Sequence, residues 1–268
     1  MKKNIALGLI LLLIASCAHH PKTFNASLES EIGDTINKQI LQSMEVAHDE
    51  PLNDYVRMIG QKISAQAGRQ DLDYRFIVLT DDRIYATHVP GGYVYLTTGL
   101  LKFLQSEIEL AGILSSEVGM LQYRDPRLSE FKKAFDFLIR TGSYIGPAFG
   151  PIGGLSVLGL ALVGNMTGSE KSLTQRLRQA DKLTLDYMMK AGYDPQGFID
   201  PLRRMRDPHS SFRPYLFDYL ESHQVTPEHL ARLDLLFQKL PLAGRQFDSG
   251  RSEFMAATQS LRNDLPRK

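Results

Sequence analysis

Hydrophobic residues repeat with a helical period along most of the chain. Ile32, Ile36 and Ile40 are spaced one helical turn apart, and the same spacing recurs between residues 55 and 67. Apolar positions three or four residues apart share one face of a helix. The pattern therefore predicts two amphipathic helices at the start of the folded region, which begins at about Ser27.

The hydrophobic period changes to two in two short stretches. In residues 74–79, Tyr74, Phe76 and Val78 alternate with Arg75, Ile77 and Leu79. Residues 92–97 are rich in residue types that favour strands. Pro90 and Gly91 precede the second stretch and are typical of a turn. Two strands are expected here, and the second is entered through a turn.

Helices are predicted for the remainder of the folded region. Ser106 and Glu109 have the spacing of a capping box, which predicts a helix from Ser106 to about Tyr123. A small sheet among many helices is an α+β architecture. Two later helix starts are predicted by an N-cap residue followed by proline, at Asp194-Pro195 and Thr226-Pro227.

The N-terminus has the pattern of a signal peptide. Lys2 and Lys3 precede an apolar run over residues 5–14, and small residues then lead to Cys17. The stretch Ile14-Ala15-Ser16-Cys17 resembles the lipobox after which bacterial lipoproteins are cleaved and acylated. A plain transmembrane anchor is the alternative, but the run is much shorter than the roughly 20 residues that span a bilayer.

This reading divides the chain into three parts. Residues 1–16 form a lipoprotein signal peptide, residues 17–26 a lipidated cysteine with its tether, and residues 27–268 a folded domain with C-terminal helices. Ala18, next to the lipidated residue, favours the outer membrane. The protein is therefore expected in the cell envelope, lipid-anchored through Cys17 and facing the periplasm.

Composition limits the partners and the sources of stability. The formal charge is +1 for the whole sequence and becomes −1 when the two signal-peptide lysines are removed, so no basic excess points to nucleic acid. With 268 residues and 43% hydrophobic content, the chain can bury one sizeable core. Cys17 is the only cysteine, so packing rather than disulfides must stabilise the fold.

One segment, residues 141–168, carries no charged residue and is rich in glycine and proline. A membrane-contacting segment and a packed pair of short helices both fit this composition. Pro147 and Pro151 interrupt the apolar stretch and leave it too short to span a bilayer, which favours the pair of helices.

Several motifs in order resemble one family. The stretches 89–101 and 106–114, followed by Ala191-Gly192-Tyr193-Asp194-Pro195, are similar to zinc metallopeptidases of the HtpX and BepA type, family forty-eight of the metallopeptidases. The similarity covers roughly residues 27–235. It implies a mostly helical, zincin-like metallopeptidase fold with a small sheet beside the active-site helix.

The resemblance places the family's catalytic motif on residues that cannot perform its chemistry. The family binds zinc through two histidines of HExxH and a glutamate of a later helix, but these positions read Ser116, Met120 and Leu177. Glu117 retains the position of the general base. Asp181 retains the position that supports the zinc ligands.

Other residues extend the comparison with the family. His223 matches a histidine at the family's cleft, and a rearranged metal site of Glu117, Asp181 and His223, with His88 nearby, is one alternative. In the other, Glu117 and Asp181 are hydrogen-bonded remnants and His223 and His229 are surface residues. The resemblance also implies a peptide-binding edge strand made of Gly92, Tyr93, Val94, Tyr95, Leu96 and Thr97.

These observations predict a pseudopeptidase without a metal or another cofactor. Its expected partners are envelope proteins or unfolded peptides, in quality control or outer-membrane assembly, besides the membrane bound through its palmitate-type anchor. Two alternatives stay open. One is a metalloendopeptidase with unconventional ligands, and the other is a structural envelope lipoprotein that docks a partner through residues 141–168.

The lipobox gives a direct prediction. Cys17→Ser removes the acylated sulfur, and the variant should lose labelling by a clickable palmitate analogue and leave the membrane fraction. Ser16→Thr, which leaves the cysteine in place, is the matched control. A Cys17→Ser protein that still sediments with membranes would mean that another segment or a partner provides the attachment.

Overall fold

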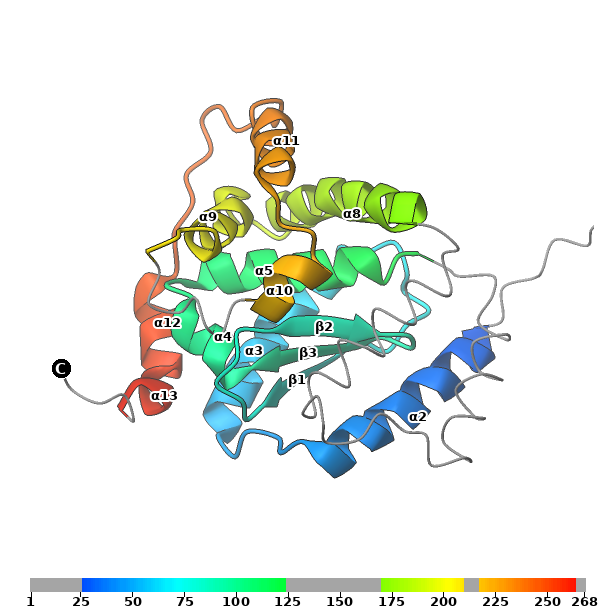
Figure 1. Cartoon of the computed structure of the whole chain (residues 1–268). Helices are drawn as coiled ribbons and strands as arrows, with labels where there is room; N and C mark the ends of the chain where they lie inside the picture. The colour runs from blue at the N-terminus through cyan, green and yellow to red at the C-terminus, as the bar shows by residue number, and fades with distance from the viewer. Residues whose placement is uncertain (1–25, 124–169, 210–216, 264–268) are drawn as a thin grey trace, which may run out of the picture.

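The computed structural model describes residues 26–123, 170–209 and 217–263, and Figure 1 shows the arrangement of their helices and strands. The first helix, α2 (Ala26–Ser43), and the second, α3 (Glu50–Ser64), occur where the hydrophobic period predicts them. No helix within these described ranges is long and apolar enough to cross a membrane. The predicted signal peptide, Cys17 and the segment 141–168 lie outside the described residues.

A three-stranded sheet is the centre of the first half of the fold. Its strands are β1 (Arg75–Leu79), β2 (Ala86–Val89) and β3 (Tyr93–Thr97), in the order β1-β3-β2. β3 pairs in parallel with β1 and antiparallel with β2. Gly91 and Gly92 have positive φ angles of 86° and 99°, so glycine suits both positions of the turn between β2 and β3.

The two faces of the sheet contact different helices. On one face, alternate residues such as Phe76 and Val94 join the main core with α3 and α5 (Glu107–Met120). On the other face, Tyr93 and Tyr95 pack against the isoleucines of α2 in a second core cluster. Both faces are therefore buried, which explains why every residue of β3 is buried.

Helix α5 lies between the sheet and a second layer of helices, α8 (Glu170–Lys190) and α9 (Gln196–Met205) (Figure 1). All residues of α5 from Glu109 to Met120 are buried, as expected for a helix without a continuous polar face. Gly112 allows α9 to approach closely, because a Cβ there would lie 2.6 Å from the backbone of Phe198.

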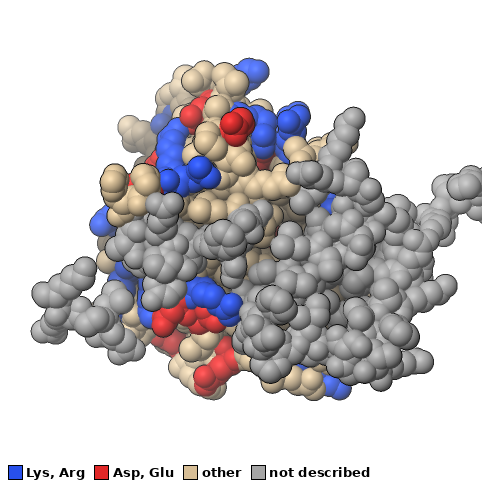
Figure 2. All heavy atoms as spheres, viewed as in Figure 1, with Lys and Arg blue, Asp and Glu red and all other residues tan. Residues whose placement is uncertain are grey.

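Four further helices follow in the described part of the chain. They are α10 (Phe217–Ser222), α11 (Pro227–Phe237), α12 (Arg251–Ala257) and α13 (Gln259–Asn263). A short helix, α4 (Thr98–Phe103), connects β3 to α5. On the face drawn in Figure 2, basic and acidic side chains of the described residues lie interspersed, in line with the nearly neutral charge.

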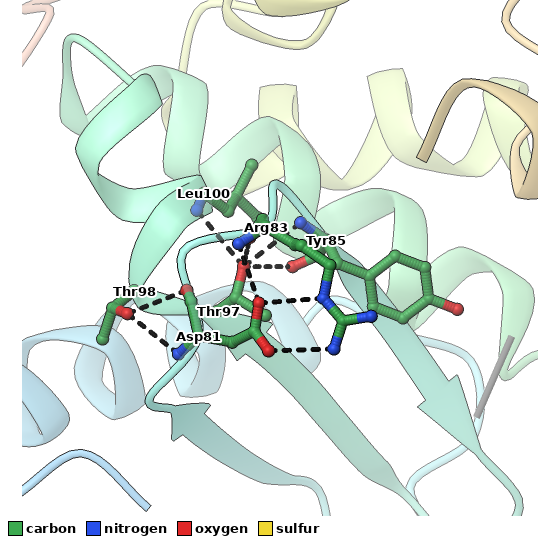
Figure 3. Close-up of polar contacts among 6 residues, drawn as sticks. All are labelled: Asp81, Arg83, Tyr85, Thr97, Thr98 and Leu100. Atoms are coloured by element: carbon green, nitrogen blue, oxygen red, sulfur yellow. Dashed lines mark hydrogen bonds and ion pairs between the residues drawn. The ribbon is translucent and has the colours of Figure 1, made fainter. Parts of the chain in front are cut away.

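Two threonines fix the loop that leads into β2 (Figure 3). The Thr97 hydroxyl accepts hydrogen bonds from the backbone N–H groups of Tyr85 and Leu100. The Thr98 hydroxyl donates to the carbonyl of Asp81, whose carboxylate pairs with Arg83. Because the loop is held at the end of β3, the position of β2 relative to the helices is defined.

Three sequence predictions need correction. Strand β2 was not expected, because its four residues have no alternating pattern long enough to detect. Residues 92–97 are not an edge strand, since β3 pairs on both sides. Ser106 begins α5, but its side chain makes no capping bond, and Glu109 accepts from the N–H of Gln105 while pairing with Arg204.

The C-terminal helices α12 and α13 pack onto the core. Phe254 of α12 is fully buried in the main core cluster. The Arg262 guanidinium of α13 donates to the carbonyl oxygens of Lys102 and Leu104, at 3.0 and 2.9 Å, and so satisfies the end of α4. Residues 251–263 are therefore an integral part of the folded unit.

Removal of the Phe254 ring should destabilise the whole domain. We expect Phe254→Ala to lower the free energy of unfolding by about 3–5 kcal/mol, because the substitution leaves a cavity in the core. Leu235→Ala on α11, where the side chain is 58% exposed, is the control and should change it by less than about 0.5 kcal/mol. Urea denaturation measures both. Equal effects would mean that the C-terminal helices are peripheral.

Candidate functional site

The candidate site lies along α5, at the residues that the sequence resemblance assigns to the family's metal-binding positions. Ser116 and Met120 are one turn apart and are 7% and 9% exposed. Between them in sequence, Glu117 is fully buried. A carboxylate in the centre of an apolar helix requires compensating partners, because burying an unpaired charge costs several kcal/mol.

Two histidines from distant parts of the chain provide these partners. His88 of β2 lies with Nδ1 2.8 Å from one Glu117 oxygen, and His223, just after α10, lies with Nε2 2.8 Å from the other. The two imidazole side chains are 23% and 13% exposed, whereas the carboxylate is inaccessible. We call Glu117, His88 and His223 the Glu117 cluster.

These partners change the acidity of Glu117. Burial alone would raise the pKa of its carboxyl group, but the charges and hydrogen bonds of His223 and His88 outweigh burial and lower the pKa from 4.5 to about 2. Glu117 is therefore ionised at physiological pH. A general base with so low a pKa is a poor proton acceptor.

The orientation of His223 is fixed by an aromatic contact. The Tyr219 ring of α10 stacks on the imidazole, with centroids 4.0 Å apart and planes 13° from parallel. Tyr219 is itself fully buried, and burial raises the pKa of its phenol well above the ordinary value. The histidine is thus held between a carboxylate and a neutral ring.

A second buried carboxylate lies on α8. Asp181 contacts His229 Nε2 at 3.0 Å and Arg232 Nη2 at 2.7 Å, both from α11. Asp181 and His229 are only 4% and 5% exposed. We call Asp181, His229 and Arg232 the Asp181 cluster. Its members are distinct from those of the Glu117 cluster.

Leu177 of α8, which the resemblance assigns to the third ligand position, faces α5. Leu177, Met120 and Ala180 form a separate apolar cluster. Leu177 also lines a small cavity with Ser116, Asp181 and His223. The space available to the centre of a water molecule there is about 10 Å³, enough for about one water. The fold thus brings the sequence-predicted positions 116, 177, 181 and 223 around one cavity.

The residues at these positions do not fit zinc. A serine hydroxyl is a poor ligand, a thioether suits softer metals, and leucine has no donor atom. Within ranges 26–123, 170–209 and 217–263, no group of three or more His, Cys, Asp or Glu side chains could hold a metal ion. Glu117 and Asp181 lie in separate clusters, so the described structure does not support the alternative cage of Glu117, Asp181 and His223.

Sequence reasoning missed the contacts of two histidines. His223 and His229 do lie beside a helix start, but the interpretation of His229 as a surface residue is wrong, because it is buried against Asp181. A signal was available, since His229 and the buried Leu233 are one turn apart on α11. The roles of Tyr219 and Arg232 had no comparable signal.

Comparison with protein families agrees with this architecture. The model of peptidase family M48 matches residues 50–237, which include the sheet, α5, α8 and both carboxylate clusters. The chain belongs to peptidase family M48. The matched M48 region ends before α12 and α13 and begins after α2, so these helices lie outside it.

Individual relatives in the M48 family are distant. The chain is 24% identical over 189 residues to the beta-barrel assembly-enhancing protease of Escherichia coli K12, and 25% identical to that of Yersinia pestis. Each alignment covers 69% of this chain and 39% of the relative. The chain therefore spans about two fifths of the length of these curated relatives.

The low pKa of Glu117 predicts a specific acid response. A carboxyl group whose pKa is lower in the folded state contributes stability above its unfolded pKa, and this contribution is lost as the pH falls through the folded pKa. The stability advantage of the wild type over Glu117→Gln should therefore be constant above about pH 4.5 and shrink between about pH 4.5 and 2. Urea titrations at several pH values measure it. A constant advantage across that window would show that the fold does not lower the pKa of this carboxyl group.

Proposed function

We propose that this chain is a non-cleaving member of peptidase family M48, a pseudopeptidase that binds envelope proteins. The observation that carries the proposal is the apolar contact of Met120 with Leu177, at two of the three positions where the family places zinc ligands. Ser116 at the third position provides only a hydroxyl group. Peptide hydrolysis in the family depends on a zinc-activated water, and these side chains cannot hold that zinc.

The state of Glu117 supports the same conclusion. A general base must reach a water or a substrate, but both oxygens of this carboxylate are engaged by histidines and neither is accessible to solvent. The low pKa further reduces its capacity to accept a proton. The retained glutamate is therefore better explained by a structural role than by catalysis.

Binding of an extended peptide requires a sheet edge and no metal. Since β3 is central, the addition of a peptide strand is proposed for β2 (Ala86–Val89), which ends the described sheet on the side of α5. Backbone hydrogen bonds to β2 would provide affinity, with little dependence on the sequence of the client.

The proposed clients are proteins of the bacterial envelope, in quality control or outer-membrane assembly. Two considerations support this. The predicted lipidation of Cys17 would anchor the domain to a membrane outside the cytoplasm. The domain would then face the periplasm. The distant relatives are named for the enhancement of beta-barrel assembly. An outer-membrane location, with the domain in the periplasm, fits both.

Metal content and proteolysis test the loss of activity. Protein purified without a metal-affinity column should contain far less than one zinc per chain after dialysis, and it should leave unfolded casein intact. The Escherichia coli relative, purified in the same way, is the positive control. One tightly held zinc per chain, or cleavage that stops when Glu117 is replaced by Gln, would refute the pseudopeptidase proposal.

The binding arm of the proposal needs a separate measurement. Photo-crosslinking from positions 86–89 in intact cells should capture uncleaved envelope proteins, whereas crosslinkers on the exposed side of α3, at Met58, should not. Equal capture from both positions would contradict recognition at β2.

A further inference from the structure

The two helices that share the family's zinc each carry a buried carboxylate in this protein. Glu117 lies on α5 and Asp181 on α8. Their exposed fractions are 0% and 4%. Neither pairs with the other helix. Both bind basic side chains from one continuous part of the chain, residues 217–237, which contains α10 and α11.

This segment reaches both helices through different side chains. His223 binds Glu117 of α5, and six residues later His229 binds Asp181 of α8, together with Arg232. Tyr219, fully buried in the main core, and Leu233 hold the two ends of the segment in the same core cluster. The segment therefore contacts both α5 and α8, through His223 and, six residues later, through His229 with Arg232.

Direct contact between α5 and α8 is apolar and close. Met120 packs on Leu177 and Ala180, and a Cβ at Gly119 would lie 3.2 Å from the carbonyl oxygen of Ala180. The helices thus pack where a metal with its ligands would need space. The small residue and the apolar side chains fill this contact without a polar group that requires a ligand.

We propose that residues 217–237 take the structural place of the metal: they connect α5 and α8 through Glu117 and Asp181, and the domain is stable without any metal ion. In this arrangement Glu117 is an anchoring residue for the segment, not a remnant of catalysis. The inference rests on the proposed loss of the zinc site. It adds that the carboxylates are needed for the folded state.

A buried ionic contact has a recognisable energetic signature. Removing the charge of one partner leaves the other charge buried and unpaired, which is strongly destabilising, whereas loss of an exposed pair has little effect. The chain contains a matched exposed pair of the same residue types. Glu45 and His48 lie 2.9 Å apart with side chains 62% and 84% exposed.

The test compares thermal melts of the full-length protein and its variants, each with EDTA and with added zinc chloride. We expect Glu117→Gln and Asp181→Asn each to lower the melting temperature by about 10 °C, and Glu45→Gln by less than about 2 °C. EDTA and equimolar zinc should leave every melting temperature unchanged, because a ligand stabilises only the state that binds it.

Hydrogen exchange shows whether the segment acts as one connection. In Glu117→Gln, amides of both α10 and α11 should exchange at least about tenfold faster, while those of α3 keep wild-type protection. If Glu117→Gln does not fold, His223→Gln decides, because it removes the same contact from the more accessible side and leaves His88 on the carboxylate. Its α11 amides should also lose protection.

Two results would overturn the inference. In the first, either carboxylate variant has the same melting temperature as the wild type. In the second, zinc raises the melting temperature in a saturable manner. The first result, in a protein that binds no zinc and cleaves nothing, would remove the structural role and leave the pseudopeptidase proposal intact. The second would refute both.

Discussion

The buried charge of Glu117 is the constraint around which the rest of the site is arranged. A carboxylate in the middle of an apolar helix is tolerated only if other groups neutralise it and satisfy both of its oxygens. His88 and His223 do so, at 2.8 Å each. Their placement depends in turn on the loop into β2, which Thr97 and Thr98 fix, and on the Tyr219 ring that stacks on His223. One side chain thus connects α5 with β2 and its entry loop and with the end of α10.

Close packing around α5 is compatible with the proposed loss of metal ligands. Gly112 allows α9 to approach from one side, and Gly119 allows α8 to approach from another. With Met120 and Leu177 in contact, the remaining cavity holds about one water. In this chain α5 and α8 are joined by apolar contact, and each carries a buried carboxylate paired with basic side chains.

Membership in peptidase family M48 describes the fold of this chain, and the loss of peptidase chemistry is a proposal. The fold positions a helix, a sheet and a later helix around a cleft, and the activity depends on a few donor atoms placed in it. In the proposed pseudopeptidase those donors are replaced, and the mostly helical architecture with its small sheet is present. The proposed functions, recognition of a client at β2 and connection of α5 to α8 by residues 217–237, use the backbone and the buried charges of the scaffold, neither of which requires a metal.

Local patterns in the sequence predicted α2, α3, α5, helix starts at α9 and α11, two of the three strands and the turn at Gly91 and Gly92. These features depend on spacing and backbone conformation over a few residues. The sequence also identified positions 116, 120, 177 and 181 as one site through the family resemblance. It could not identify β3 as the central strand, because pairing order is not written in the pattern of a single strand. The sequence also could not show which basic side chain binds which carboxylate. His88 and His223 are 29 and 106 residues from Glu117, and only the packed tertiary structure brings them together.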